Sequence, residues 1–381
     1  MPIKVFLVDD SPVALIVLKR ILASSREVEV VGTAHTAKEA LALIPMLKPD
    51  VICTDFHMPQ MNGLEFTQEI MANFPRPILV ISTAVQREDT NNVFQLLNAG
   101  AVDVFPKPKN GLLLENSQLT EDLIRKIKIL SGVKVFTRRK PSSASPHRVN
   151  SAGKLTSTLT SASTSTFASK LIRMVAIGAS TGGPQALHTI FTQLPTNLSV
   201  PVVCIQHISE GFLQGLVNWL NVQCSLSVQI ARNGEIPQNG TVYFAPECYH
   251  LEVDRQGRFL YTSAPPLAGH RPSITVTFQS LARYYGDRSV GILLTGMGRD
   301  GADGLAAIAQ SGGMTIAQDE ASSVVFGMPK EAIALKAAQQ VLSIDTIASV
   351  LLQHIAHASQ TASKLTTEDQ RKFRSFRREP E

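Results

Sequence analysis

The chain has 381 residues, of which 44% are hydrophobic, enough for two domains that each bury a core. Its net charge of +5 is unevenly distributed: the stretch 131–170 holds seven Lys and Arg and no Asp or Glu, and 364–381 holds six basic against four acidic residues. The basic surplus therefore lies outside the expected domains, which disfavours nucleic-acid binding as the main function.

The sequence predicts no membrane span, no signal peptide and no cysteine-based metal or disulfide site. No apolar run approaches the roughly 18 to 20 residues that cross a bilayer, and the first strand runs directly into Asp9 and Asp10, unlike a signal peptide. The four cysteines form no Cys-x-x-Cys pair, which argues against a zinc site or a disulfide framework. We expect a soluble cytoplasmic protein with no membrane insertion.

Residues 1–125 predict a first α/β domain. Short apolar strands are expected at 3–8, 28–31, 50–54, 77–81 and 102–105, alternating with amphipathic helices at 12–24, 36–47, 63–73 and 88–98. Continuous apolar strands separated by helices indicate a doubly wound parallel sheet that is covered on both faces.

The rest of the chain predicts a linker, a second domain and a tail. Residues 126–170 are rich in Ser, Thr and basic residues without periodicity, which is typical of a flexible linker. Residues 171–358 predict a second doubly wound domain that ends with a helix at 345–357, followed by a charged tail at 359–381. Its strands are expected near 173–178, 201–206, 227–230, 241–245, 289–294 and 314–317.

Polar groups follow several strands of the first domain. Asp9 and Asp10 follow the first strand, Asp55 the third, Ser82 the fourth and Lys107 the fifth. Because parallel strands end at one edge of the sheet, these groups should converge there. Three carboxylates at one place call for a hard cation such as Mg²⁺, while Lys107 and Ser82 could contact phosphoryl oxygens. A carboxylate acting as nucleophile would give an aspartyl phosphate.

The segment 55–63 (DFHMPQMNG) resembles the D-x-x-M-P-x-M-[DN]-G signature of response-regulator receiver domains, over roughly residues 1–125. The resemblance implies a flavodoxin-like fold, Asp55 as the phosphorylated residue, and Mg²⁺ bound by Asp9, Asp10, Asp55 and the backbone carbonyl of His57. The imidazole of His57 is interpreted as an exposed loop group, since Mg²⁺ favours oxygen.

Three strand ends of the second domain also bear reactive side chains. Ser180 lies in a glycine-rich turn before a helix that begins with Pro184, His207 follows a second strand, and Asp300 lies in the turn after a third. Serine, histidine and aspartate are the parts of a nucleophile, a base and an orienting acid. The helix N-terminus near Ser180 could stabilise an oxyanion.

Other interpretations compete. The Gly178-x-Ser180-x-Gly182 turn also matches the nucleophile elbow of α/β-hydrolases, which would require Asp319 with His354 or His357. A dinucleotide site is disfavoured because G-x-G-x-x-G is missing. A non-catalytic binding module controlled by phosphorylation remains a further alternative. His188, His250 and His270 are interpreted as ordinary polar residues.

The segments GASTGG (178–183), QH (206–207), HRPS (270–273), LTGMGRDG (294–301), AQDE (317–320) and GMP (327–329) resemble the catalytic domain of the chemotaxis protein-glutamate methylesterases, over about 171–355. The order receiver, linker, esterase is also that family's order.

The resemblance implies a Rossmann-like fold and a metal-independent triad of Ser180, His207 and Asp300, with Thr181 and the backbone of Met297 as oxyanion donors. The substrates would be glutamate γ-methyl esters and selected glutamines of chemoreceptors, and the phosphodonor a sensor histidine kinase. Thr275 stands where the family pattern has an aspartate, which leaves the triad intact.

Overall fold

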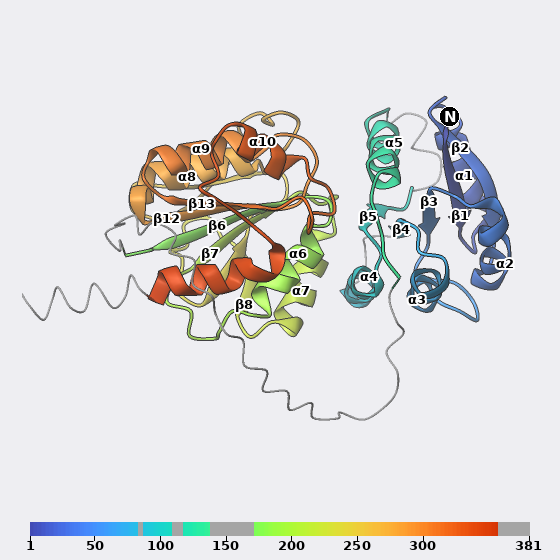
Figure 1. Ribbon diagram of the computed structural model, residues 1–381, viewed down its shortest axis with the longest axis horizontal. Helices are drawn as coiled ribbons and strands as arrows, with labels where there is room; N and C mark the ends of the chain where they lie inside the picture. Colours follow the sequence, from blue (N-terminus) through green and yellow to red (C-terminus); the bar gives the residue numbers. More distant parts are fainter. Residues whose placement is uncertain (83–86, 109–116, 138–170, 357–381) are drawn as a thin grey trace, which may run out of the picture.

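The computed structural model describes residues 1–82, 87–108, 117–137 and 171–356. Figure 1 shows two α/β domains, one built from each half of the chain. Most of the predicted linker and the whole predicted tail lie outside the described residues. In the described ranges, every helix is too short or too polar to span a bilayer.

The N-terminal domain has five strands that pair in parallel in the order β2-β1-β3-β4-β5. This 2-1-3-4-5 order is that of flavodoxin-like folds, and the predicted doubly wound sheet is confirmed. The strands are β1 (Ile3–Val8), β2 (Val28–Ala34), β3 (Val51–Thr54), β4 (Ile78–Ser82) and β5 (Asp103–Pro106).

Helix starts in this domain follow local capping chemistry. Ser11 accepts a hydrogen bond from Ala14 N at the first turn of its helix, and Asn62 and Glu65 form a capping box at another. These caps fix where α1 begins, four residues after β1, and where α3 begins, after the loop that follows β3. The helices are α1 (Pro12–Leu22), α2 (Ala37–Leu47), α3 (Gly63–Asn73), α4 (Arg87–Ala99) and α5 (Ser117–Ser131).

The predicted start of the linker at residue 126 is wrong. Helix α5 continues to Ser131, and two lysines of its last turns hold it to the domain. Lys126 Nζ lies 2.7 Å from Asp103 Oδ2, and Lys128 Nζ lies 2.7 Å from Glu27 Oε1. Ile127 and Leu130 of the same turns are fully buried, so the helical period continues past the predicted boundary.

The C-terminal domain has a seven-stranded parallel sheet in the order β14-β13-β12-β6-β7-β9-β8, which confirms the second doubly wound domain. Its strands are β6 (Met174–Ala179), β7 (Val202–Gln206), β8 (Ser227–Ile230), β9 (Thr241–Phe244), β12 (Ser289–Leu293), β13 (Met314–Gln318) and β14 (Gln340–Leu342). The sequence did not predict β14.

Helices cover both faces of this sheet, and a hairpin of β10 (His250–Val253) and β11 (Phe259–Thr262), also unpredicted, lies beside it. A last helix spans 344–356, close to the predicted 345–357. The other helices are α6 (Gly183–Phe191), α7 (Leu213–Gln223), α8 (Ile274–Tyr285), α9 (Ala302–Gln310), α10 (Met328–Ala334) and the short 3-10 turn η1 (Gly286–Arg288).

The strand order of the second sheet creates one switch point. From β6 the chain first adds β7, β8 and β9 on one side and then crosses to β12 on the other side. Loops that leave the carboxyl ends of β6 and β12 therefore diverge and leave a crevice, which is where ligands bind in open α/β sheets.

The domains contact each other along α4. Helix α4 packs against α6 and α7, as Figure 1 also shows. The buried rings of Phe94 and Trp219 stack with centroids 5.8 Å apart, and His188 stacks on the same Trp219 at 5.1 Å. Gln185 Nε2 donates a hydrogen bond of 2.7 Å to Ala101 O. A single buried apolar cluster thus continues from one domain into the other.

Candidate functional site

Ser180 follows the fully buried strand β6 and is held from both sides. Its N–H donates to Thr295 O (3.0 Å), beyond the end of β12, and its carbonyl accepts from Gln206 Nε2 (2.7 Å), at the end of β7. Gly183 is required here because a Cβ would lie 2.0 Å from Gln206 Oε1. Close packing of the turn thus fixes the serine at the switch point.

His207 and Asp300 meet at the same edge. His207 N donates to Ala179 O (2.9 Å), which places the histidine beside the strand that carries the serine. His207 Nε2 lies 2.9 Å from Asp300 Oδ2. Both ring nitrogens of His207 are buried, and neither has a hydrogen-bond partner of good geometry among the described residues, Ser180 included. The contact between Nε2 and Asp300 is therefore close in distance but poorly aligned as a hydrogen bond.

Asp300 accepts hydrogen bonds from four groups at the start of α8 and beside it. The donors are the hydroxyl of Ser273 and the backbone N–H groups of Ile274, Thr275 and Gly301, at 2.8 to 3.0 Å. Burial opposes ionisation, but the imidazole of His207 and the contacts with Thr275 outweigh it and hold the pKa of Asp300 well below its usual range. The carboxylate is therefore charged at neutral pH.

Thr275, the departure from the family pattern, supports Asp300 in a second way. Its hydroxyl accepts a hydrogen bond of 2.8 Å from Gly301 N, the residue after Asp300. A threonine here thus fixes the turn that carries the acid without adding a second carboxylate. The site chemistry tolerates this difference.

The two predicted oxyanion donors lie on either side of Ser180. Thr181 is buried, and its carbonyl accepts from the hydroxyl of Thr295 (3.0 Å). Met297 follows β12 and is 46% exposed, close to the position where Gly296 packs against the Cβ of Ser180. Their backbone N–H groups as oxyanion donors stay a prediction.

The α/β-hydrolase alternative finds less support. Asp319 accepts from the N–H (2.9 Å) and hydroxyl (2.6 Å) of Ser322 and so serves a local turn. His354 is exposed on the last helix, and His357 lies outside the described residues. The acid that contacts a strand-end histidine is Asp300.

Several supporting residues were missed or discounted from the sequence. Gln206 holds the serine turn, Ser273 caps α8 and bonds Asp300, and His270 stacks on His207. All three lie in segments that resemble the family, QH (206–207) and HRPS (270–273), and that is the sequence signal they carried. His250 agrees with its interpretation as an ordinary polar residue, since its ring accepts from Ser273 N and contacts Pro265 O.

The carboxylates of Asp9, Asp10 and Asp55 gather at the carboxyl edge of the first sheet, with ligand atoms within 4.8 Å of one another. Lys107 Nζ lies 2.6 Å from Asp55 Oδ2, 2.9 Å from Asp9 Oδ1 and 2.8 Å from Asp9 Oδ2, so one ammonium serves two of the three carboxylates. The negative charge that remains on this oxygen-rich cluster fits an Mg²⁺ ion.

Charge in this cluster is balanced by few groups. Burial, the largest cause, raises the pKa of Asp9, and Lys107 only partly opposes it. Burial also disfavours the ammonium of Lys107, yet its bonds to Asp55 and Asp9 raise its pKa above the ordinary value. The Ser82 hydroxyl is buried and has no hydrogen-bond partner among the described residues, so it fits a role in contacting a ligand oxygen.

His57 lies beside this cluster, but its side chain is not among the clustered ligands. The residue is exposed, and its ring meets Phe56 edge-on with centroids 4.8 Å apart. The backbone carbonyl of His57 stays a predicted ligand.

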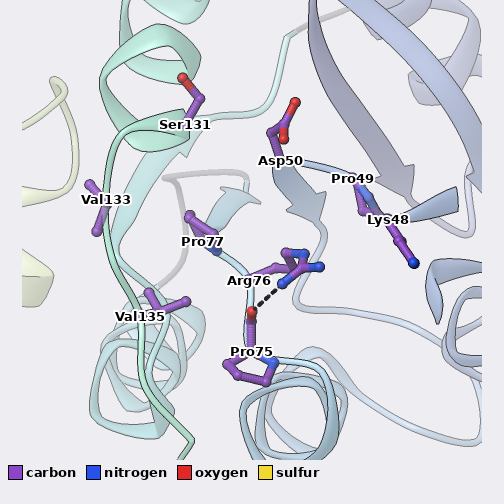
Figure 2. A pocket seen from close by; sticks show the side chains of 9 residues that line it. All are labelled: Lys48, Pro49, Asp50, Pro75, Arg76, Pro77, Ser131, Val133 and Val135. Atoms are coloured by element: carbon purple, nitrogen blue, oxygen red, sulfur yellow. Dashed lines mark hydrogen bonds between the residues drawn. The ribbon is translucent and has the colours of Figure 1, made fainter.

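A hollow of about 250 Å³ lies at the opposite edge of the first sheet (Figure 2). Lys48 and Asp50 border it before β3, and Arg76 borders it before β4, where its guanidinium donates to Pro75 O. The hollow is thus remote from the carboxylate cluster of Asp9, Asp10 and Asp55, which lies at the other edge of the same sheet.

Comparisons with known proteins agree with this division. A family model described as CheB methylesterase matches residues 175–351, and one described as response regulator receiver domain matches residues 5–117. A crystal structure of the Thermotoga maritima CheB methylesterase catalytic domain is 36% identical and covers 48% of this chain and 98% of that chain, with a TM-score of 0.47.

Relatives that match this chain over almost their whole length show which family it belongs to. The protein-glutamate methylesterase/protein-glutamine glutaminase of Nitrosospira multiformis is 40% identical over 360 residues, which cover 94% of this chain and 99% of that protein. Enzyme 1 of the same name from Syntrophus aciditrophicus is 39% identical, over 92% of this chain and 98% of that protein. The resemblance indicated by the motifs is confirmed: the chain belongs to the protein-glutamate methylesterase/protein-glutamine glutaminase family of chemotaxis enzymes with an N-terminal receiver domain.

Proposed function

We propose that this chain removes γ-methyl esters from glutamates, and amide nitrogen from selected glutamines, on the cytoplasmic helices of chemoreceptors. Ser180 is the nucleophile, His207 the general base and Asp300 the orienting acid. Phosphorylation of Asp55 by a sensor histidine kinase controls the rate. The observation that carries this assignment is the buried contact of 2.9 Å between His207 and Asp300 at the edge that bears Ser180.

The ring orientation of His207 assigns different tasks to its nitrogens. Since Nε2 faces the carboxylate of Asp300, Nε2 carries the proton and Nδ1 is the basic nitrogen. Many serine triads use the reverse orientation, with Nδ1 toward the acid. Nδ1 is buried and unpaired, which supports a role in accepting the proton of Ser180. The serine–histidine bond would form as the substrate closes the site.

The reaction proceeds in two halves. Ser180 Oγ attacks the ester carbonyl while its proton passes to His207, and the proton then leaves with methanol as the C–O bond breaks. Water next attacks the acyl-enzyme, gives its proton to His207, and releases glutamate as Ser180 regains a proton. Deamidation follows the same course with ammonia as the leaving group.

Control by the receiver is supported by contacts around the catalytic edge. Gln185, which bonds the receiver at Ala101, lies on the helix that begins three residues after Ser180. Val324, which packs on Gly182 of the serine turn, also packs against the apolar cluster of the receiver. In this docked arrangement the receiver restricts the approach of a receptor helix. Phosphorylation would favour an undocked form.

The phosphorylation site has the groups for such a switch. A bound Mg²⁺, held by Asp9, Asp10 and Asp55, would neutralise their charge and that of an incoming phosphoryl group. Lys107 and the unpaired Ser82 hydroxyl would then bond phosphoryl oxygens. Ser82 ends β4, the strand that precedes the interface helix α4, so a shift of Ser82 could reach the interface.

The test is methanol release from methylated receptor, with a small-molecule phosphodonor and Mg²⁺. Ser180→Ala should lower kcat by several orders of magnitude, as in other triads. Ser349→Ala is the matched control, because this exposed hydroxyl only bonds its own helix at Thr346 O. A Ser180→Ala enzyme that retains wild-type activity would refute the assignment.

A fluorophosphonate probe separates the enzyme from a binding module. Labelling of the phosphodonor-treated protein at Ser180 supports covalent catalysis. A folded, treated protein that binds receptor but neither takes the label nor releases methanol would instead be a phosphorylation-controlled binding module.

A further inference from the structure

A second histidine lies flat against the catalytic one. The rings of His207 and His270 are parallel within 4°, with centroids 4.0 Å apart. His270 is half-buried, and its ring covers the face of the imidazole whose edge contacts Asp300. A parallel stack at this separation restricts rotation of the His207 ring, because any tilt would bring the two rings into collision.

The backbone that carries His270 is itself held in place. Leu267 and His270 exchange two N–H···O bonds, of 3.1 and 3.0 Å, around a two-residue turn. Both central residues are left-handed, Ala268 at φ 49° and Gly269 at φ 84°. Gly269 suits that conformation, while Ala268 adopts it at a cost that the surroundings must offset. Three residues after His270, Ser273 caps α8 and bonds Asp300, so one short segment carries the ring that stacks on His207 and a hydroxyl that holds Asp300.

We propose that His270 is a positioning residue, whose ring holds the His207 imidazole in the plane that faces Asp300 and so keeps Nδ1 available to accept the proton of Ser180. The inference rests on the proposed function and adds to it a residue outside the triad. In the reaction His207 becomes an imidazolium, and the face of a neutral aromatic ring attracts such a cation, whereas a charged neighbour would repel it.

The charged surroundings of His270 agree with an uncharged ring. Burial, followed by the nearby His207, lowers the pKa of His270 to about 4. Asp300 opposes this shift. Arg125 and Asp122, which form an ion pair on receiver helix α5, act least: Arg125 lowers the pKa of His270 and Asp122 raises it. At neutral pH His270 is therefore neutral and can stack on either charge state of His207.

The test uses the full chain, treated with a phosphodonor and Mg²⁺, and measures kcat and KM for methanol release from methylated receptor. His270→Ala removes the ring, His270→Gln keeps a polar side chain without a ring, and His270→Phe restores a flat ring that cannot be charged. Misplaced catalytic groups cost on the order of 100-fold, so Ala and Gln should lower kcat about 10- to 100-fold with KM changed less than about threefold. Phe should recover kcat to within about threefold of the wild type.

Controls separate this proposal from the function on which it rests. His35→Ala, an exposed receiver histidine, should leave kcat unchanged. Wild-type activity that is lost in Ser180→Ala establishes the function whatever His270 does. Once the function is established, the positioning role is overturned if His270→Ala and His270→Gln keep kcat within threefold of the wild type. It is also overturned if His270→Phe is as slow as His270→Ala and His270→Gln. If His270→Ala does not fold, the Gln and Phe variants decide by the same criteria.

Discussion

The hydrogen bond from Gln185 to Ala101 offers a clean way to weaken docking of the receiver. Gln185 lies on catalytic helix α6, and its Nε2 donates 2.7 Å to Ala101 O, a carbonyl at the entrance to receiver strand β5. Gln185→Ala leaves α6 intact, since alanine is the best helix former. The change therefore acts on the contact between the domains rather than on either fold.

The expected size follows from the chemistry of the bond. Losing one amide–carbonyl hydrogen bond costs about 1 kcal/mol, and a buried acceptor left unsatisfied costs about 1–3 kcal/mol. In the docked form, Ala101 O would lose its donor, but the change also removes Gln185 Oε1, which is buried without a partner. These effects partly cancel, leaving about 1 kcal/mol against docking. That corresponds to about a fivefold shift toward the undocked form.

The assay is methanol release from methylated receptor, with and without phosphodonor. The unphosphorylated rate of Gln185→Ala should rise about fivefold, while the fully phosphorylated rate stays at the wild-type value. Gln193→Ala is the matched control, because this exposed residue follows α6 and its amide bonds Thr189 O of that same helix. An unphosphorylated rate that does not rise, or an equal rise in the control, would refute docking as the restraint.

Two further predictions concern the carboxylate cluster and pH. Asp55→Asn should abolish stimulation of methanol release by the phosphodonor, because an amide cannot form the aspartyl phosphate. Chelation of Mg²⁺ should abolish the same stimulation in the wild type. Stimulation that persists in both assays would contradict the proposed site. The pKa of His270 is about 4 in the folded state and about 6.5 in an unfolded chain, so the unfolded state binds more protons between these values and stability falls as pH drops through this window. After a discount for partial exposure, the loss at pH 5 is about 1 kcal/mol. Thermal unfolding should be measured at pH 7.5 and at pH 5 for the wild type and for His270→Phe. The decrease in Tm between the two pH values should be about 2–4 °C smaller in the variant than in the wild type, and equal decreases would argue against a depressed pKa of His270.

The two reactive edges were predictable because they depend on local signals. Strand and helix periods locate the strand ends, and parallel pairing brings those ends to one edge whatever the details of packing. Asp9, Asp10 and Asp55 gather as expected, and His207 meets Asp300 although 93 residues separate them in the chain.

The prediction failed at the end of the first domain and at short strands. The linker boundary was placed at 126 because the resemblance to receiver domains ends near 125, yet α5 runs on to Ser131 with its apolar face buried. The hairpin β10–β11 and strand β14 were also missed. Strands of three or four residues carry too few alternations for a period to be recognised.

The reactive residues could be predicted from short motifs, since a serine turn, a strand-end histidine and the acidic ends of strands are each recognisable from a few neighbouring residues. Three-dimensional packing alone decides which nitrogen of His207 faces Asp300, which ring covers it, and which amide joins the domains. Those contacts join segments that are remote in sequence, and their side-chain directions follow from close packing, which no local pattern encodes.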